Sequence, residues 1–296
     1  MNLDQILKGL GKKGDIPNLE NNELNVDNTE KEKRAEELYI KKYKNGILTE
    51  EYEALEKIYN QIKTDQDFDT FYIKNNRINI KDGHVVYLNL SFTQVSDINP
   101  IKDLVNLRGL DLFYTKVSDI NPIENLVNLE YLSFSCCKLI NSIDSIKYLK
   151  KLKKLSISST SVKDMSSIEN LKDLEELYFD GAPIKNISPI ENLMNLKVVY
   201  FYDTQVSDIS PIENLKNLEK FYLGKQVKDI NPIANLKNIK ELGILFMRIE
   251  DIKDISPIEN LENLKILNLK GSYVNPSDLT TKSIIYKLKQ RKVLVT

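Results

Sequence analysis

One stretch of twelve residues returns almost unchanged along this chain, and its return is regular. TQVSDINPIKDL at 93–104 reappears as TKVSDINPIENL at 115–126 and as TQVSDISPIENL at 204–215. The first two copies start 22 residues apart, and the third starts 89 residues after the second, which is four such steps plus one residue. A unit this short cannot bury its apolar face alone, so the fold must be a stack of repeated units.

Alignment on this register divides most of the 296-residue chain into nine units. They begin at Val85, Leu107, Leu129, Leu152, Leu174, Leu196, Leu218, Ile239 and Leu264. Each follows the pattern L-x-x-L-x-L-x-x-T-x-V-x-D-I-x-P-I-x-N-L-x-N. The alternation in LxxLxL predicts a strand with one buried face. In sequences such as DISPI, the Ser or Asn before proline is expected to cap a short helical turn that proline helps to start.

The leucine spacing and the period resemble the leucine-rich repeats of internalins and of cytoplasmic phosphatase-regulating leucine-rich repeat proteins, over roughly residues 85–271. The resemblance implies an α/β solenoid, a right-handed leucine-rich-repeat horseshoe. A parallel sheet would line its concave face, short helical turns would form its convex side, and a small helical segment would precede the repeats.

Those families usually place asparagine at the ninth position of each unit, where its side chain bonds the backbone of adjacent coils. This chain has other residues there: Thr93, Thr115, Cys137, Thr160, Ala182, Thr204, Met247 and Ser272. A threonine hydroxyl can bridge less backbone than an amide, so we expect a weaker ladder in the same coil.

The segments beside the repeats are expected to cover the open ends of the solenoid. Residues 66–84 predict an N-terminal cap with a β-hairpin. Residues 272–296 predict a C-terminal cap, with a helix over Ser277–Lys289, whose apolar residues include Leu279, and a closing strand at 293–295. Three repeat units are also irregular, because the units from Leu129, Leu218 and Ile239 gain one residue, lose one and gain three. Such changes are either tolerated surface insertions or the shaping of a binding edge.

Upstream, residues 31–65 predict a helical hairpin, with helices over Glu30–Lys44 and Thr49–Lys63. Gly46 is expected to stop the first helix and Thr49 to cap the second. The apolar stripe of the second helix either docks on the N-terminal cap or pairs with another molecule, and docking is expected because the cap is the nearest apolar surface. Residues 1–30 are polar and are predicted to be disordered.

Charge and apolar patterning exclude several classes of partner. The 42 basic and 43 acidic residues leave a net charge of -1, so we expect no nucleic-acid partner. No apolar run approaches the roughly 20 residues of a membrane span. MNLDQILKGLGKK lacks the apolar core of a secretory signal, and the only cysteines, Cys136 and Cys137, are adjacent and cannot staple distant segments. We therefore expect a cytoplasmic protein, or alternatively one exported by a signal-peptide-independent route.

The sequence predicts no catalytic, cofactor-binding or metal site. Its single histidine, His84, is interpreted as a turn residue at the cap boundary and not as a general base. There is no nucleophile elbow, no phosphate-binding glycine loop and no Cys/His cluster for zinc. The adjacent cysteines are interpreted as structural, with a redox pair as the alternative. We therefore expect no enzyme; an active site in the N-terminal segment is the weakest alternative.

The resemblance implies that the third, fifth and seventh positions of each unit line the concave face. The fifth-position column contains three consecutive tyrosines, Tyr178, Tyr200 and Tyr222, with Tyr202 and Asp180 beside them in the seventh column. Adjacent strands lie about 4.8 Å apart, so the rings should form one strip. Tyrosine is common at protein interfaces. The alternative is that tyrosine is a good strand residue and the strip packs against itself.

A second aromatic group is predicted nearer the N-terminus. It comprises Tyr87, Phe113, Tyr114 and Tyr131. Charges of alternating sign in the third column, including Lys220, either orient a partner or form an ordinary solvated face.

These patterns predict a non-enzymatic, monomeric protein-protein interaction module without a cofactor, which binds a protein partner on the concave face. The candidate partner-binding residues are Tyr178, Tyr200, Tyr202, Tyr222, Asp180, Lys220, Tyr131 and Phe113. The alternative, suggested by the internalin resemblance, is an exported adhesin or effector that recognises a host protein.

Overall fold

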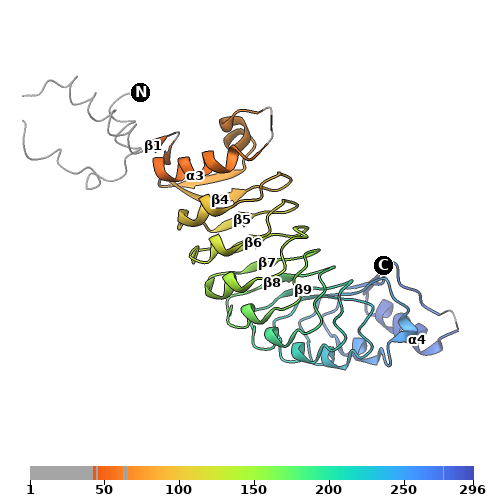
Figure 1. Ribbon diagram of the computed structural model, residues 1–296. Helices are drawn as coiled ribbons and strands as arrows, with labels where there is room; N and C mark the ends of the chain where they lie inside the picture. Colours follow the sequence, from red (N-terminus) through yellow and green to blue (C-terminus); the bar gives the residue numbers. More distant parts are fainter. Residues whose placement is uncertain (1–42, 45, 63, 65, 276) are drawn as a thin grey trace, which may run out of the picture.

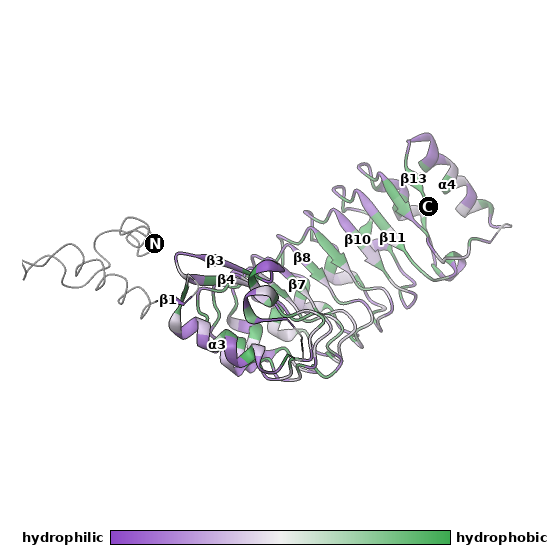
Figure 2. Cartoon of the chain, turned by 90° about the horizontal axis from the view of Figure 1, so that it is seen from above, coloured by the Kyte–Doolittle hydropathy of each residue, from purple (hydrophilic) through white to green (hydrophobic). Residues whose placement is uncertain are grey.

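The computed structural model describes residues 43–296 apart from 45, 63, 65 and 276, so the predictions for residues 1–42 lie outside the described residues. The described chain forms one curved stack of coils, with helix α3 (Thr49–Tyr59) at one end and helix α4 (Leu279–Gln290) at the other (Figure 1). The strands lie side by side in an 11-stranded sheet that follows chain order (Figure 2). The predicted leucine-rich-repeat solenoid is confirmed.

Each of the nine units contributes one strand, and neighbouring strands are parallel and in register. Their bounds are β4 His84–Asn89, β5 Gly109–Asp111, β6 Tyr131–Ser133, β7 Lys154–Ser156, β8 Glu176–Tyr178, β9 Val198–Tyr200, β10 Lys220–Leu223, β11 Glu241–Ile244 and β12 Ile266–Asn268. The fourth residue of each unit points into the core, as Leu132, Leu177 and Leu242 do with no exposed surface. Stacking one apolar residue on the next in this way is what makes the coils mutually dependent.

The outer side of the coils consists of short 3₁₀ turns. They cover Asn99–Asp103, Asn121–Ile123, Asp144–Tyr148, Ser166–Ile168, Ser188–Ile190, Ser210–Ile212, Asn231–Ile233, Ile249–Asp251 and Ser256–Asn260. Their capping differs from the prediction. In the turn that begins at Ser210, the serine supplies only its backbone N–H, which donates to Asp208 Oδ1 at 2.8 Å. The Asp of the repeat pattern therefore supplies the acceptor, because its carboxylate reaches the N–H two residues later in an Asx turn, while the N-cap residue itself, Ile209, makes no side-chain bond.

The ninth-position residues form a local bond and not a continuous ladder. Thr93, Thr115, Thr160 and Thr204 each donate Oγ1 to a carbonyl three residues earlier in their own coil. Cys137 and Ser272 instead donate to the preceding coil, at 3.0 and 2.7 Å from the carbonyl oxygens of Leu112 and Ile244. Because the four threonines bond within their own coil, they do not join neighbouring coils, which agrees with the weaker ladder expected at this position.

An asparagine ladder does exist, but at the last position of the unit. The side-chain amides of Asn128, Asn195, Asn217, Asn238 and Asn263 each donate to a backbone carbonyl of the preceding coil at 2.8–2.9 Å. These bonds hold adjacent coils together at the outer end of the turn. The sequence prediction considered the ninth position and missed this one, although the general repeat pattern ends in N; the units from Leu129 and Leu152 are exceptions that end in Lys151 and Asp173.

The N-terminal end differs from the predicted helical hairpin. Strand β1 (Tyr43–Lys44) pairs antiparallel with β2 (Ile47–Leu48), so the first helix cannot extend to residue 44. Gly46, with φ +77°, makes the tight reversal that joins them. Helix α3 ends at Tyr59 and not at residue 63. Its N-cap is Leu48, which has no side-chain oxygen, and Thr49 is already helical.

Helix α3 docks on the N-terminal cap, as its apolar stripe predicted, because the rings of Tyr52 and Tyr59 contact that of Phe68. Tyr52, Leu55 and Ile58 are buried. Beyond the helix, the Gln61 side chain donates to the carbonyl of Asp97 at 2.7 Å and accepts from its N–H at 3.0 Å. A π-helical turn (Thr70–Lys74) then leads to β3 (Ile78–Lys81), which pairs antiparallel with β4 and completes the predicted hairpin.

The C-terminal end is closed by a helix and a strand, close to the prediction. Asp278 caps α4, and its Oδ1 accepts from the N–H groups of Thr280 and Thr281 at 3.0 and 3.1 Å. Ile284 and Leu288 are buried, whereas Leu279, another apolar residue of the predicted helix, is 78% exposed. Strand β13 (Leu294–Val295) adds to β12 in parallel.

Candidate functional site

Three tyrosines form a continuous row across neighbouring strands of the inner face. Tyr178, Tyr200 and Tyr222 are direct partners in the registers of β8, β9 and β10. Their ring centroids lie 5.2 Å and 4.1 Å apart, edge to face in the first pair and tilted in the second. Beneath them, Phe179 and Phe201 stack inside the core with centroids 5.5 Å apart. We call Tyr178, Tyr200 and Tyr222 the tyrosine row; its rigid support comes from the packed core below.

The row is not uniformly accessible. Tyr178 and Tyr200 are half-buried, whereas Tyr222 is only 8% exposed. The Tyr222 ring lies on Gly243 in the next coil, where a Cβ would stand 2.2 Å from a ring carbon. Each of the two sequence interpretations therefore applies to part of the row. Tyr222 packs against the protein itself, whereas Tyr178 and Tyr200 keep exposed surface for contact with a partner.

The charges beside the row pair with one another. The Tyr178 hydroxyl donates to Glu176 at 2.9 Å, and Glu176 forms an ion pair with Lys154 at 2.8 Å. At the other end the Tyr222 hydroxyl donates to Glu241, which pairs with Lys220 at 3.4 Å. Lys220 therefore belongs to this paired network. The third-position column is better described as an ordinary solvated face with paired charges than as a row of unpaired charges that orient a partner.

The phenols of the row remain protonated over an extended pH range. Burial, reinforced by the carboxylates that accept their hydroxyls, raises the pKa of Tyr178 and of Tyr222. Burial also raises the pKa of Tyr200. Each ring can therefore offer an apolar face together with a neutral hydroxyl, which is what makes tyrosine useful in a contact surface.

Asp180 and Tyr202 lie side by side in the seventh column. Asp180 Oδ1 accepts from the backbone N–H of Tyr202 at 3.0 Å, and its Oδ2 accepts from Ser158 Oγ at 3.3 Å. Burial raises the pKa of the Asp180 carboxyl to about 6, against the lowering effect of these bonds. Tyr202 is 37% exposed, more than any tyrosine of the row, and its ring centroid lies 6.1 Å from that of Phe246.

The second aromatic group is separate from the row. Tyr131 contacts Tyr87 across one intervening strand, with centroids 6.3 Å apart, and burial raises the Tyr131 pKa to about 12. Tyr87 bridges the intervening coil because Gly109 has no side chain: a Cβ there would stand 2.4 Å from the Tyr87 ring. Phe113 instead contacts Phe92 and Tyr114, so the predicted group is two smaller clusters.

The glycines that seat aromatic rings were missed in the sequence. Gly109 and Gly243 each stand on the inner face where a side chain would otherwise project, and Gly271, in the turn after β12, leaves room for the Phe246 ring. The available signal was a glycine inside a strand pattern, which often marks close approach of another group.

The described residues contain no group of three or more His, Cys, Asp or Glu side chains able to hold a metal ion. His84 is the first residue of β4 and not a turn residue; its Nδ1 lies 2.7 Å from Glu51 Oε1. Cys136 is partly exposed and Cys137 is buried, and burial raises the pKa of the Cys137 thiol. In the same part of the chain, no helix is both long and apolar enough to span a membrane.

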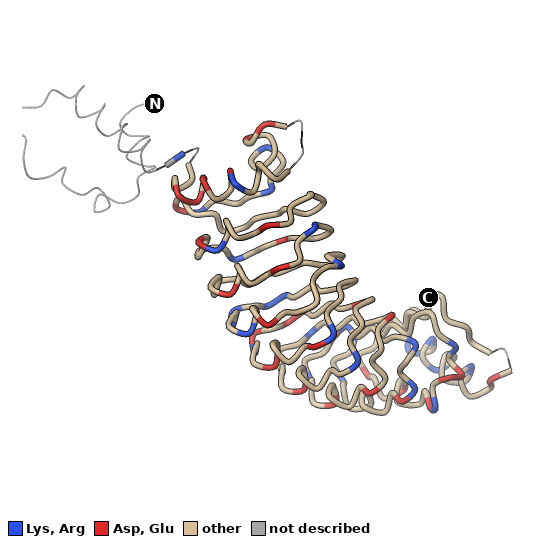
Figure 3. The backbone as a smooth tube through the Cα atoms, in the orientation of Figure 1, with Lys and Arg blue, Asp and Glu red and all other residues tan. Residues whose placement is uncertain are grey.

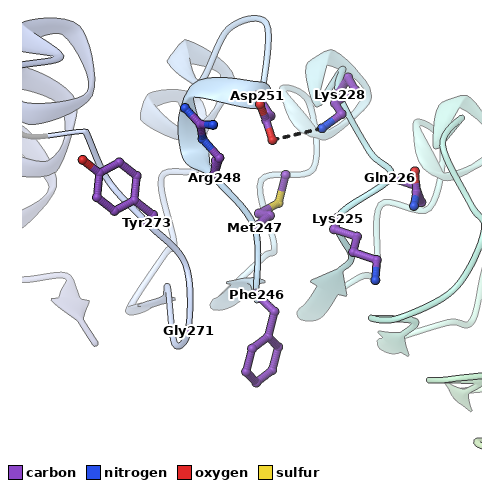
Figure 4. Close-up of a pocket in the computed structure, with 9 residues that line it drawn as sticks. All are labelled: Lys225, Gln226, Lys228, Phe246, Met247, Arg248, Asp251, Gly271 and Tyr273. Carbon is purple, nitrogen blue, oxygen red and sulfur yellow. Dashed lines mark ion pairs between the residues drawn. The ribbon is translucent and has the colours of Figure 1, made fainter.

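A hollow of 460 Å³ lies where the shortened unit from Leu218 meets the lengthened unit from Ile239 (Figure 4). Met247 lies at its centre, and Lys225, Arg248, Phe246 and Tyr273 surround it. Its cations are paired: Lys225 with Asp203 at 3.3 Å, Lys228 with Asp251 at 3.4 Å, and Arg248 with Glu250. The hollow is therefore a charge-balanced step between irregular coils.

Comparison with known proteins agrees with this architecture. A family model that describes two copies of the leucine-rich repeat matches residues 105–148 and again residues 195–238. Comparison with curated protein sequences gave no significant match.

Solved structures supply closer similarity. Internalin C2 of Listeria monocytogenes is 27% identical, with a TM-score of 0.59 over 75% of this chain and 92% of that protein. An internalin F structure from the same organism is 26% identical, with a TM-score of 0.51 over 71% and 72%. A leucine-rich repeat protein of Leptospira interrogans shares the fold at 20% identity, with a TM-score of 0.52 over 71% and 60%. The chain is therefore a leucine-rich repeat protein with internalin-like repeats.

Proposed function

We propose that this protein is a non-enzymatic interaction module that binds a partner protein on its concave face. The contact surface would centre on Tyr178, Tyr200 and Tyr202, with Asp180 beside them and Lys220 at the margin. Tyr222 would act mainly by holding the row in place. The observation that carries the proposal is the tyrosine row itself, in which the partly exposed rings of Tyr178 and Tyr200 touch each other and are backed by the buried ring of Tyr222.

Two physical features favour this surface. Rigid aromatic rings lose little conformational freedom on binding, and tyrosine combines a large apolar face with a polar tip. The neighbouring charges are already paired within the face, so a partner need not neutralise unpaired charges there. Tyr131 and Phe113 lie on coils nearer the N-terminus and would extend the contact to a larger partner.

Affinity capture from the native cell tests the proposal. The wild-type protein would be compared with a Tyr178→Ala/Tyr200→Ala/Tyr202→Ala variant, because Tyr222→Ala would leave a hole above Gly243. The matched control is Tyr148→Ala/Tyr286→Ala, which removes tyrosines that are 57% and 65% exposed elsewhere. A partner retained by the wild type and the control but lost by the row variant supports the proposal; equal retention by all three contradicts it.

A second candidate is an exported adhesin or effector that recognises a host protein, and the similarity to two Listeria internalins favours it. The two candidates share a binding face and differ in where the protein acts. We propose first that it acts in the cytoplasm. Finding the protein in culture supernatant without release of a cytoplasmic marker would favour export by a route independent of a signal peptide.

A further inference from the structure

An aromatic cluster stands on the turn edge of the first two coils, away from the tyrosine row. Phe92, Phe113 and Tyr114 contact one another with ring centroids 5.0 to 6.3 Å apart. Phe92 is 69% exposed and Tyr114 is 59% exposed. We call these three residues the aromatic ridge. Large apolar groups gathered at this exposure are a recurrent mark of an interaction site.

The backbone beneath the ridge is unfavourable for the residues it carries. Phe92 and Tyr114 occupy the eighth position of their units with φ of +58° and +55°. The equivalent position holds Gly181 and Gly271 in two later coils, and Cys136, Ser159, Asp203 and Phe246 in others, all at positive φ. Glycine accepts this left-handed conformation freely, whereas a bulky side chain there is an outlier. The coil requires a positive φ at this position, but it does not require an aromatic side chain there. The rings of Phe92 and Tyr114 are therefore better explained by a functional role than by folding.

The exposed charge on the turn segments of the ridge is basic, although the Asp111 carboxylate beside the ridge accepts the N–H of Phe113 at 2.9 Å. Lys116 and Lys138 are exposed on the second and third coils, and in the described part of the chain neither has a carboxylate within ion-pair distance. The segments 91–96, 113–118 and 135–141 contain no Asp or Glu. Asp97 and Asp119 follow the first two of these segments, but each accepts the N–H of a 3₁₀ turn at 2.8 Å. Elsewhere charges of both signs are interspersed along the coils (Figure 3).

A hollow of 330 Å³ adjoins the ridge and shares Phe92 as a lining residue. Phe71 and Arg77 also line it, and its described lining contains no carboxylate. Arg77 lies over the Phe71 ring at 4.7 Å and donates Nη1 to the carbonyls of Asn89 and Ser91. The guanidinium is thereby held in place beside the hollow, and it is the only charged group among the described residues that line it.

We propose that the aromatic ridge and this hollow form a second docking surface, whose occupant is an acidic segment of a partner protein that carries an apolar side chain. The apolar side chain would pack against Phe92 within the hollow. The carboxylates would face Arg77, Lys116 and Lys138. Charge complementarity selects this occupant, because cations without bound counter-charges gain most from a carboxylate brought to an apolar surface.

The test is selection of a random-peptide phage library on the immobilised full-length protein, followed by anisotropy titration of the selected peptides. We expect acidic peptides with an aromatic or aliphatic residue. Phe92→Asn/Tyr114→Asn should weaken them by about tenfold or more, as for aromatic anchors. Asparagine tolerates positive φ, so this variant keeps the coil. Lys116→Glu/Lys138→Glu should weaken the same peptides, and Tyr148→Asn should not.

Other results would overturn the proposal. Failure to select any peptide, selection without acidic bias, or equal binding by the Phe92→Asn/Tyr114→Asn variant would each contradict it. Sedimentation with phosphatidylserine vesicles that requires Phe92, without peptide selection, would assign the ridge to a membrane surface instead. The Tyr178→Ala/Tyr200→Ala/Tyr202→Ala variant should bind the selected peptides normally, so this test is independent of the tyrosine row.

Discussion

Asn106 Nδ2 lies 3.0 Å from Nδ1 of His84, at the place in its unit where later asparagines meet the backbone of a preceding coil. Asn106 ends the first unit and has no earlier repeat behind it. His84 in turn contacts Glu51, a buried carboxylate of helix α3 that also accepts the N–H of Val85 at 2.7 Å. The pair thus connects the first repeat to the helix that covers the solenoid.

The asparagine ladder should contribute measurably to stability. Asn217→Ala removes a bond to the carbonyl of Met194 in the preceding coil, and we expect a loss of about 0.5–1 kcal/mol in the free energy of unfolding. The matched control is Asn192→Ala, whose amide reaches only its neighbour Glu191, at 3.2 Å. Urea titration of both variants measures the difference; equal stability would show that the ladder is incidental.

The capping aspartate of the repeat can be separated from the residue that follows it. Asp208→Ala removes the acceptor for the Ser210 N–H, so we expect a cost of about 1 kcal/mol. Ser210→Ala keeps that N–H and should change the unfolding free energy little. Thermal or urea unfolding of the two variants distinguishes them, and a larger cost for Ser210→Ala would restore the original interpretation of the cap.

Gly243 should be required for the seating of Tyr222. Gly243→Ala places a Cβ 2.2 Å from the present ring position, so the ring must move. Overpacking of this kind costs about 1–3 kcal/mol. In the Tyr222→Ala background the same change should cost much less, and a double-mutant cycle measures the coupling. Additive effects of the two substitutions would contradict the contact.

Asp180 should make stability depend on pH with an unusual sign. Its folded-state pKa is about 6, above the ordinary value of 3.8, because the carboxyl is buried. The folded protein therefore binds more protons than the unfolded chain between these values, and this carboxyl lowers stability as pH rises through them. Asp180→Asn should be more stable than the wild type above about pH 6, by at most about 3 kcal/mol, and equal to it below about pH 4.

Asp254→Asn is the control of opposite sign. Hydrogen bonds from the Ser256 side chain and backbone N–H lower the pKa of the Asp254 carboxyl. Its charged form therefore stabilises the folded state at higher pH, and this stabilisation fades as pH falls through the lowered pKa. Denaturant unfolding across this pH range should show the two variants diverging from the wild type in opposite directions. The same sign for both would refute the burial argument for Asp180.

The repeat register was sufficient to predict the solenoid, since apolar spacing alone sets which residues enter the core. The tyrosine row also followed from the register, because strand neighbours share a position number. The solvent accessibility of the tyrosines could not be predicted from the register. Whether the Tyr222 ring projects from the face or packs against it depends on Gly243, 21 residues later, and no local pattern in the Tyr222 strand reveals this.

Capping and coil-to-coil bonds were harder to predict for a different reason. Asp208 and Ser210 are both good capping residues, and only backbone geometry decides which accepts the N–H. Asn217 and Thr204 are both able to bond a carbonyl, and the direction of the chain at each position decides whether that carbonyl belongs to the same coil or the previous one.

The most direct test of the central claim is the dissociation constant of the captured partner for the wild type, the Tyr178→Ala/Tyr200→Ala/Tyr202→Ala variant and the Tyr148→Ala/Tyr286→Ala control, all shown to be folded by circular dichroism. Loss of a central aromatic anchor typically costs about 2 kcal/mol, which corresponds to roughly 30-fold in affinity. We predict a weakening of at least this size for the row variant and no change for the control. Equal dissociation constants for all three proteins would contradict binding on the concave face.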